Sequence, residues 1–285
     1  MRVLVTGANG QLGTELVDLY GARSGDDVLG IDLPDMDITS SDSVASSFSS
    51  FSPDVVINCA AWTAVDAAEE NEESALIVNG DGPRVLAAAC RDAGAWLVQV
   101  STDYVFSGEA SSPYAEDATP DPQSAYGRTK LAGELAVQSE LPDAHYIVRT
   151  AWLYGHEGNN FVKTMLRLES ERDTIDVVDD QIGQPTYAAD LAAQIALLVD
   201  ARPAAGIFHG TNSGQVSWHG FTQEIFRLNG ADPARVLAVT SEQFIRPAPR
   251  PAYSVLGHDR WAHVGLPEMR DWREAIAEAM EHGFV

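Results

Sequence analysis

Strand-like and helix-like segments alternate regularly over the first 150 residues of this chain, and few folds can accommodate such a pattern. Each strand-like segment is a short apolar run, and each is followed by a stretch with polar and apolar residues at helical spacing. Strands are expected at residues 2–6, 27–31, 55–59, 96–100 and 145–149, and helices from Leu12 to Tyr20 and at 40–51, 69–93 and 124–139. This alternation predicts a parallel sheet covered by helices on both faces.

The alternation becomes irregular after about residue 155. Helices are expected at 161–168, 187–199, 217–228 and 271–282, and strands at 175–178 and 207–208. The predicted fold class is α/β: a Rossmann-type doubly wound parallel sheet with a smaller mixed α/β substrate-binding lobe. We assign residues 1–155 to the NAD(P)-binding Rossmann domain. Residues 156–285 are assigned mainly to the substrate-binding lobe, with some segments interleaved with the Rossmann domain.

The charge balance excludes several classes of partner. Asp and Glu number 42 against 18 Lys and Arg, which gives a net charge of -24, and only Lys130 and Lys163 are lysines. So acidic a chain repels nucleic acid and anionic lipid, and its apolar runs are too short to span a membrane. Excess acid with scarce lysine favours a halophilic protein, because molar salt screens the repulsion. An acidic mesophilic enzyme is the alternative.

The cysteines and the start of the chain predict the compartment. Cys59 and Cys90 are too few for a disulfide framework. Strand-like sequence begins at Arg2, where a secretory leader would otherwise lie. Together these observations predict a cytoplasmic protein.

Three glycines between the first strand and the first helix have the spacing of a dinucleotide-binding turn. The segment Thr6–Gly13 reads G-x-x-G-x-x-G from Gly7 onward. In such a turn Gly7 permits the tight bend, Gly10 lets the backbone approach a pyrophosphate, and Gly13 allows close helix–sheet packing. The helix that follows offers unpaired amides to the phosphates. We predict a dinucleotide site here, with a purely structural turn as the alternative.

An acidic residue after the second strand predicts which dinucleotide is bound. Asp32 lies where a carboxylate can accept hydrogen bonds from the ribose hydroxyls and repel a 2′-phosphate. No Arg or Lys occurs between Leu33 and Val44 to bind that phosphate. NADH is therefore the predicted cofactor, with NADPH also allowed. Asp37 and Ile38 are expected to flank the adenine.

Tyr126 and Lys130 are predicted to carry the chemistry. They lie one turn apart at the start of an expected helix, so they share a face. A nearby ammonium is expected to lower the pKa of the phenol and let the pair exchange a proton with a carbonyl or an alcohol. Thr102, which ends the fourth strand, is placed to hydrogen-bond the same oxygen. A surface Tyr–Lys pair is the alternative, although lysine is too rare here for chance to favour it.

Longer motifs resemble those of a known family. The chain is similar to the extended short-chain dehydrogenase/reductases, and within them to the dTDP-4-dehydrorhamnose reductases. The matching segments, which together extend over nearly the whole chain, are Thr6–Gly13, NCAAWTAVD at 58–66, STDYVFSG at 101–108, YGRTKLAGE at 126–134, RTAWLYG at 149–155, GNNFVKTMLR at 158–167, DDQIGQPT at 179–186 and RPAYSVL at 250–256.

The resemblance implies NAD(P)H-dependent reduction of the 4-keto group of a dTDP-6-deoxy-L-lyxo-4-hexulose to dTDP-L-rhamnose. Tyr126 would protonate the oxygen, Lys130 would tune it and hold the nicotinamide ribose, and Thr102 would assist. By position, the residues implied to line the cofactor are Gly10, Gln11, Leu12, Asp32, Asp37, Ile38, Ala61, Trp62, Thr63, Tyr126 and Lys130. Those implied to contact the sugar are Thr102, Asp103 and Trp152.

Two departures from the family pattern limit what carries over. Some members pair their subunits through a magnesium ion held by glutamates. Glu15 matches one of these, but alanine stands at Ala188 and Ala189 where a second is expected, and His282 lies near the third. No metal is therefore predicted, while a homodimer is allowed. Gly257 also stands where the family often has Asp.

Other functions remain open at this point. One is an epimerase or dehydratase of the same superfamily. Related dehydratases carry an Asp-Glu pair after the catalytic threonine, whereas Asp103 is followed by Tyr104. The other is a regulatory binding protein similar to the regulatory subunit of methionine adenosyltransferase. Asp103, Trp152 and the segment 159–161 resemble the reductases more closely, and turnover of a keto-sugar nucleotide separates the two classes.

Overall fold

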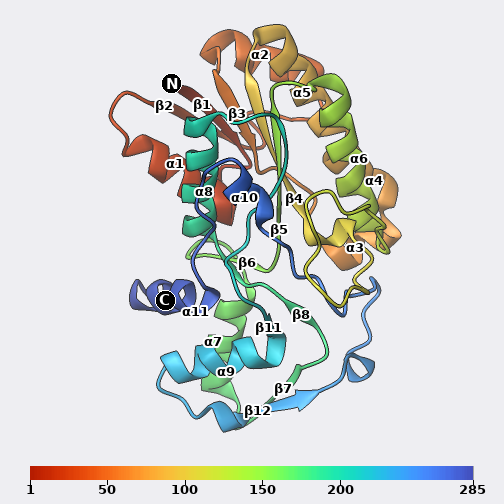
Figure 1. Ribbon diagram of the computed structural model, residues 1–285, viewed down its shortest axis with the longest axis vertical. Coiled ribbons are helices and arrows are strands. Elements are labelled where there is room, and N and C mark those ends of the chain that lie inside the picture. Colours follow the sequence, from red (N-terminus) through yellow and green to blue (C-terminus); the bar gives the residue numbers. More distant parts are fainter. Residues whose placement is uncertain (285) are drawn as a thin grey trace.

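The computed structural model describes residues 1–284 and is built around a six-stranded parallel sheet (Figure 1). Its strands are β1 (Arg2–Thr6), β2 (Asp27–Ile31), β3 (Val55–Asn58), β4 (Trp96–Thr102), β5 (His145–Thr150) and β10 (Gly206–His209). They lie in the order β10-β5-β4-β3-β1-β2, so the chain extends the sheet first to one side of β1 and then to the other. Such a reversal leaves a crevice at the carboxyl ends of β1 and β3, where ligands bind in open α/β sheets.

Helices cover both faces because successive strand residues point to opposite sides of the sheet. Val3 and Val5 are buried with α1 (Gln11–Gly21) and α8 (Ala188–Ala201). Leu4, between them, is buried with the opposite layer, which consists of α2 (Ser41–Phe51), α5 (Gly82–Ala93) and α6 (Ala125–Glu140). The two layers lie on either side of the sheet in Figure 1. This arrangement confirms the predicted doubly wound α/β fold.

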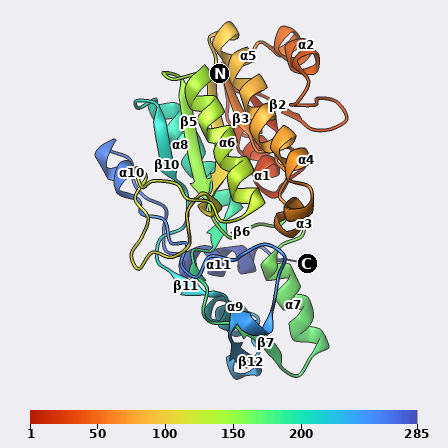
Figure 2. The same cartoon turned by 90° about the vertical axis from the view of Figure 1, so that its right-hand side faces the viewer.

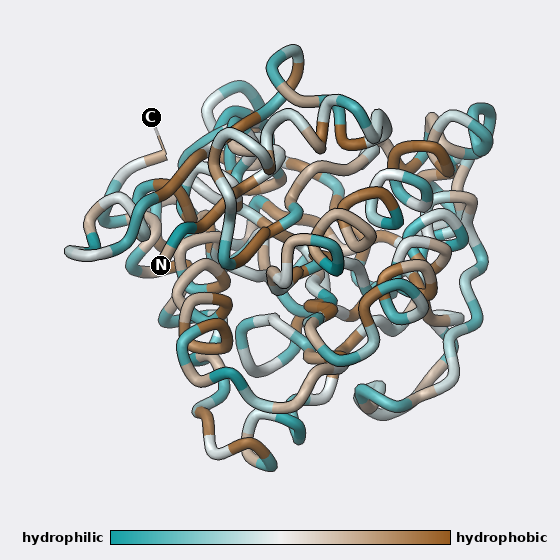
Figure 3. Tube along the Cα trace, turned by 90° about the horizontal axis from the view of Figure 1, so that it is seen from above, coloured by the Kyte–Doolittle hydropathy of each residue, from teal (hydrophilic) through white to brown (hydrophobic). Residues whose placement is uncertain are grey.

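In the view from above, hydrophobic and hydrophilic stretches alternate along the helices, and many of the outer turns are hydrophilic (Figure 3). Each of the four residues of β3 and each of the six of β5 is buried. In the part of the chain that the structure describes, no helix combines the length and the apolar character that crossing a bilayer requires.

The single helix expected at 69–93 is wrong in detail, because this region contains four segments. They are α3 (Val65–Glu70), α4 (Glu72–Leu76), a π-helical turn (Ile77–Asp81) and α5. Pro83 has no backbone N–H, so the carbonyl of Asn79 cannot receive the regular i+4 hydrogen bond. The wide turn points the side chain of Asn79 at Trp62, whose amide donates to the Asn79 Oδ1 at 2.8 Å.

The C-terminal part of the chain divides between two places. Helix α8 and strand β10 return to the main sheet, whereas other elements form a smaller lobe below it (Figure 2). The remaining elements are the helices α7 (Phe161–Glu171), α9 (Trp218–Leu228), α10 (Asp259–His263) and α11 (Trp272–Glu281), 3₁₀ turns at Asp103–Val105, Pro233–Arg235 and Ser241–Gln243, and the short strands β6 (Leu153–Tyr154), β7 (Ile175–Val178), β8 (Ile182–Gly183), β9 (Thr186–Tyr187), β11 (Val216–Ser217) and β12 (Val236–Val239). The smaller lobe has an apolar core of its own, with Phe221 and Trp272 fully buried.

Candidate active site

A cleft of about 480 Å³ opens at the carboxyl ends of the central strands. The glycine turn after β1 forms one wall, and the residues after β3, β4 and β5 form the others. The predicted site residues that line it are Gly7, Gly10, Gln11, Leu12, Gly13, Ala61, Thr63, Thr102, Asp103, Tyr126, Lys130 and Trp152. Residues from five separate stretches of sequence therefore meet in one cavity.

The glycine turn has the geometry that a dinucleotide needs. Gly7 has φ +64°, and a Cβ there would lie 2.6 Å from the backbone nitrogen of Ala60. A Cβ on Gly13 would lie 2.2 Å from the carbonyl oxygen of Gly7, so only glycine lets α1 begin this close to β1. Gly10 caps α1 without a side-chain hydrogen bond, which leaves the first amides of the helix free for an anion. The cradle fits a pyrophosphate.

The expected adenine-side residues lie outside this cleft. Asp32 directly follows β2 beside the glycine turn, and its Oδ2 accepts a hydrogen bond from the amide of Asn9 at 3.2 Å. Asp37 is exposed and accepts hydrogen bonds from Thr39. Ile38 is buried in the core between α2 and α5. Of these three residues, Asp32 is the one that is hydrogen-bonded to the glycine turn, through the amide of Asn9.

Trp62 also lies outside the lining of the cleft. Its indole packs with Tyr126 around the buried Ala68, Ala75 and Ala125. The backbone of Trp62 is held on both sides by Asn79, whose Nδ2 donates to the Trp62 carbonyl at 3.1 Å and to Thr129 Oγ1 at 3.1 Å. Asn79 thereby connects the loop after β3 to α6. Asn79 could not be identified from the sequence, because its role depends on the π-helical turn.

Helix α6 brings Tyr126 and Lys130 into the cleft. The Ser124 hydroxyl accepts a hydrogen bond from the amide of Gly127 at 3.1 Å, which starts the helix just before Tyr126. Lys130 is buried, and its Nζ donates to the carbonyl of Val100 at 2.7 Å. Gly127 lies so close to the chain after β4 that a Cβ would be 2.2 Å from the carbonyl of Tyr104. This contact keeps α6 against the end of β4.

The expected lowering of the Tyr126 pKa by Lys130 is wrong for this arrangement. Burial raises the pKa of Tyr126 to about 12, and a hydrogen bond with Thr102 opposes that rise only in part. Burial lowers the pKa of Lys130 to about 8, while the charge of Glu134 acts in the opposite direction. The ammonium is directed at a carbonyl rather than at the phenol. The Tyr126 phenol therefore carries its proton at neutral pH.

Asp103 follows Thr102 directly and is buried. Its Oδ1 accepts a hydrogen bond from the Thr102 hydroxyl at 2.9 Å. Burial raises the pKa of Asp103 to about 6, against the opposing hydrogen bonds from Ser254 and Thr102. Two further hydroxyls in the lining, Ser101 Oγ and Thr150 Oγ1, are buried and have no hydrogen-bond partner within residues 1–284. The cleft thus offers several polar groups to a hydroxylated ligand.

Trp152 has a strained backbone in the far wall of the cleft, with φ +45°. Its indole stacks on that of Trp218 in α9, with ring centroids 3.5 Å apart and an interplanar angle of 10°. A Cβ on Gly183 would lie 2.5 Å from the Trp152 ring, so glycine is needed there. The smaller lobe therefore holds this wall in place.

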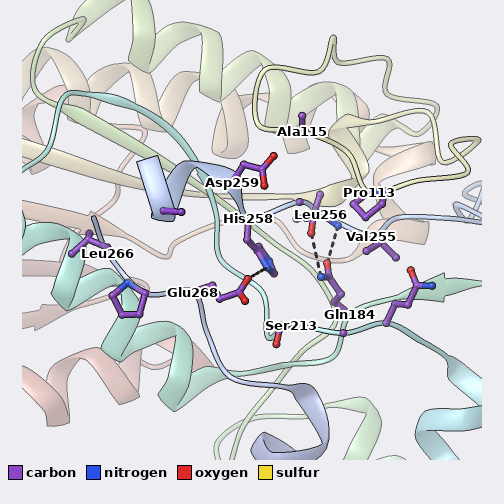
Figure 4. A pocket seen from close by; sticks show the side chains of 15 residues that line it. Pro113, Ala115, Gln184, Ser213, Val255, Leu256, His258, Asp259, Leu266 and Glu268 are labelled. Atoms are coloured by element: carbon purple, nitrogen blue, oxygen red, sulfur yellow. Dashed lines mark hydrogen bonds and ion pairs between the residues drawn. The ribbon is translucent and has the colours of Figure 1, made fainter. Parts of the chain in front are cut away.

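A second cavity, of about 840 Å³, has Val255, Leu256 and Gly257 in its lining (Figure 4). Its polar lining includes Gln184, His258 and Glu268, and the His258 Nδ1 lies 3.5 Å from the Glu268 carboxylate. None of the predicted site residues lines it. The chemistry-bearing residues therefore belong to the smaller cleft.

The residues considered for a metal lie on α1 and beside the C-terminal helix. Glu15 is half-buried, and burial raises its pKa against the opposing influence of His156. His156 Nδ1 is 2.9 Å from the carbonyl oxygen of Gly283. Within the described residues, 1–284, no three His, Cys, Asp or Glu side chains converge on a point that could hold a metal ion.

Comparison with known proteins gives consistent similarity over the whole chain. The profile of the RmlD substrate binding domain matches residues 1–284. The chain is 53% identical over 282 residues to a dTDP-4-dehydrorhamnose reductase of Streptomyces griseus, covering 98% of this chain and 92% of that protein. It is 51% identical over 278 residues to a dTDP-4-keto-6-deoxy-D-glucose reductase of Streptomyces niveus, covering 98% and 96%.

A solved structure shows the same similarity in three dimensions. The dTDP-4-dehydrorhamnose reductase of Bacillus anthracis, crystallised in complex with NADP, superposes with a TM-score of 0.94 at 40% sequence identity. The superposition covers 99% of each chain.

Proposed function

The chain belongs to the RmlD substrate binding domain family, and from that membership we propose that it reduces the 4-keto group of a dTDP-6-deoxy-L-lyxo-4-hexulose to give dTDP-L-rhamnose. It is an NAD(P)H-dependent oxidoreductase. The observation that carries the proposal is the meeting of Thr102, Tyr126 and Lys130 in the cleft that also contains the glycine turn. A dehydratase, an epimerase or a non-catalytic subunit has no comparable support.

A nicotinamide cofactor supplies the hydride when it is bound. We assign its pyrophosphate to the amides at the start of α1, after Gly10, and its adenosine ribose to Asp32. Ala61, Trp62 and Thr63 follow β3 and would border its middle. Asp37 and Ile38 would lie beyond the adenine, outside the cleft. Lys130 would hold the nicotinamide ribose.

Tyr126 is the proton donor of the proposed reaction. The carbonyl carbon gains a hydride, its oxygen gains the phenolic proton, and the C=O double bond becomes a secondary alcohol. A phenol whose pKa is about 12 carries its proton at neutral pH, which supports the role of acid rather than base. The Thr102 hydroxyl would hydrogen-bond the same oxygen and fix its position. Asp103 and Trp152 would contact the sugar, through a carboxylate and an indole face.

We propose NADH as the preferred cofactor. The position of Asp32 beside the glycine turn supports this choice, since a carboxylate there repels a 2′-phosphate. The absence of Arg and Lys from Leu33 to Val44 also supports it. NADPH remains a usable alternative, because the relative from Bacillus anthracis was crystallised with NADP.

A second substrate is supported by one comparison. The relative from Streptomyces niveus is named for dTDP-4-keto-6-deoxy-D-glucose, which differs from the first substrate in the configuration of the sugar ring. The test is NADH oxidation at molar salt with a panel of 4-keto-6-deoxy sugar nucleotides carrying dTDP or UDP. Turnover of the L-lyxo substrate at the highest kcat/KM supports the proposal. A higher kcat/KM for the D-glucose derivative would change the proposed substrate but not the proposed reaction, the reduction of a 4-keto group.

We further propose a cytoplasmic, salt-adapted homodimer. Free thiols at Cys59 and Cys90 are consistent with a reducing compartment. The surface formed by α4, the π-helical turn and α6 exposes Leu76, Ile77 and Leu135, the last with 56% of its surface accessible. Light scattering of the wild type and of Leu135→Glu tests the pairing, since a charge on this surface should give a monomer. Fractionation of the source cells tests the compartment.

A further inference from the structure

Glu134 lies one turn beyond Lys130 on α6, on the face that also carries Tyr126. The residue is 1% exposed, and its carboxylate receives two parallel hydrogen bonds from Arg149 of β5. Arg149 Nε to Glu134 Oε1 is 2.9 Å, and Arg149 Nη2 to Glu134 Oε2 is 2.6 Å. Both groups are taken fully out of water, directly behind the proposed catalytic pair.

Two carboxylates lie near Lys130: Glu134, whose charge raises the Lys130 pKa, and Asp103 in the cleft, whose own pKa burial raises to about 6. The other groups that line the cleft around Lys130 are Cys59 after β3, Thr102 at the end of β4, and Tyr126 on its own helix. Burial raises the pKa of the Cys59 thiol to about 12, so this group is neutral near pH 7. The Val100 carbonyl accepts a hydrogen bond from Lys130 but carries no net charge.

Arg149 is itself held on several sides. Its guanidinium lies 4.9 Å from the centre of the Phe106 ring, and Nη1 is 3.5 Å from the carbonyl oxygen of Glu116. His209, its neighbour on β10, is kept neutral because burial and the charge of Arg149 lower its pKa to about 3. The guanidinium therefore has a single carboxylate partner, and that partner is fixed in place.

We propose that Glu134 is a positioning residue that keeps Lys130 protonated, and that Arg149 orients its carboxylate for this purpose. The proposal rests on the proposed function, in which Lys130 acts as an ammonium. An ammonium taken out of water tends to lose its proton, and an opposite charge within one helical turn counteracts this loss. The Glu134 carboxylate thus interacts with two buried cations. Arg149 holds the carboxylate in place, and the carboxylate keeps the Lys130 ammonium charged.

The scarcity of lysine allows a direct test on the protein without any ligand. With lysine labelled with ¹³C at Cε, NMR detects two side chains, and Lys163→Arg assigns the remaining signal to Lys130. We expect Glu134→Gln to lower the titration midpoint of Lys130 by about one to three pH units. Glu140→Gln removes a carboxylate from the far end of the same helix, where it pairs with Arg91, so it should leave the Lys130 midpoint unchanged. An unchanged midpoint in Glu134→Gln overturns the proposal.

A second variant covers loss of folding. Breaking a buried pair leaves one charge unpaired, whereas replacing both partners is tolerated better. If Glu134→Gln does not fold, the double variant Glu134→Gln/Arg149→Met replaces it. Because this variant also removes the positive charge of Arg149, the Lys130 midpoint should fall by less than in Glu134→Gln, and an unchanged midpoint overturns the proposal. Turnover tests the proposed function separately from the role of Glu134. In Glu134→Gln the fall of kcat/KM at alkaline pH should move to lower pH, together with the NMR midpoint of Lys130. A shifted midpoint without any turnover in the wild type would contradict the proposed function alone.

Discussion

The indole rings of Trp152 and Trp218 stack with their centroids 3.5 Å apart and their planes within 10° of each other. Trp152 follows β5 at the wall of the cleft, whereas Trp218 opens α9 in the smaller lobe. The pair therefore joins the smaller lobe to the wall of the cleft. The strained φ of +45° at Trp152 is maintained by this contact and by the close approach of Gly183.

The first prediction concerns this stack. Trp218→Leu removes the partner ring, and aromatic pairs contribute about 0.5–1.5 kcal/mol beyond burial. We therefore expect the KM for the keto-sugar nucleotide to rise about 3- to 10-fold, with the NADH dissociation constant unchanged. Trp96→Leu is the matched control, because its stack with Tyr146 lies at the opposite end of the sheet. Equal KM values in the two variants would contradict the role given to Trp218.

The second prediction concerns the proton donor. Tyr126→Phe keeps the ring but removes the acid, so kcat should fall roughly 10²-fold or more, while NADH still binds. Steady-state kinetics and fluorescence titration of NADH measure the two effects. Tyr146→Phe is the control, since its hydroxyl donates to the carbonyl of Pro203 away from the cleft. Near-normal turnover in Tyr126→Phe would exclude the proposed mechanism.

The third prediction concerns cofactor choice. NADH should give the higher kcat/KM, and Asp32→Ala should narrow the difference, because the carboxylate that repels the 2′-phosphate is lost. Asp35→Ala removes an exposed carboxylate from the same loop and should leave the ratio of kcat/KM for NADH to kcat/KM for NADPH unchanged. A wild-type preference for NADPH would refute the assignment of Asp32.

The fourth prediction concerns pH. Burial raises the pKa of Asp103 to about 6, so the folded chain binds more protons than the unfolded chain between about pH 4 and pH 6. This group therefore lowers stability as the pH rises through that window. The difference in thermal midpoint between Asp103→Asn and the wild type should therefore favour the variant more at pH 7 than at pH 4. The exposed Asp117→Asn should show no such dependence. An equal difference in thermal midpoint between variant and wild type at pH 4 and at pH 7 would exclude Asp103 as a source of the pH dependence.

The fifth prediction concerns salt. Neither lysine pairs with a carboxylate within residues 1–284, since Lys130 and Lys163 both donate to backbone carbonyls. A net charge of -24 must then be offset by dissolved cations. Thermal midpoint and activity should rise together from dilute buffer to molar KCl, where the Debye length is about 3 Å. An uncharged osmolyte separates screening from general exclusion. Full stability and maximal activity in dilute buffer would refute the salt adaptation.

The local sequence pattern was sufficient to predict much of the fold and the glycine turn. The strands at 2–6 and 27–31 lie where the apolar runs predict them. In β1 the reason is burial on both faces, which favours apolar residues along the strand. Gly7 and Gly13 could be identified from spacing, because the close approach of α1 to β1 admits no side chain at either position. The four-residue spacing of Tyr126 and Lys130 placed them on one helical face before any contact was known.

Tertiary structure decided what each of these groups does. Lys130 reaches the Val100 carbonyl instead of the phenol, and burial raises rather than lowers the pKa of Tyr126. Asn79 bonds to Trp62 only because Pro83 opens a π-helical turn in a segment that would otherwise be one regular helix. Glu134 and Arg149, 15 residues apart in sequence, meet because α6 packs across β5. Sequence by itself determined which residues could share an element. Burial and long-range packing, which depend on all the elements at once, determined their partners and their protonation.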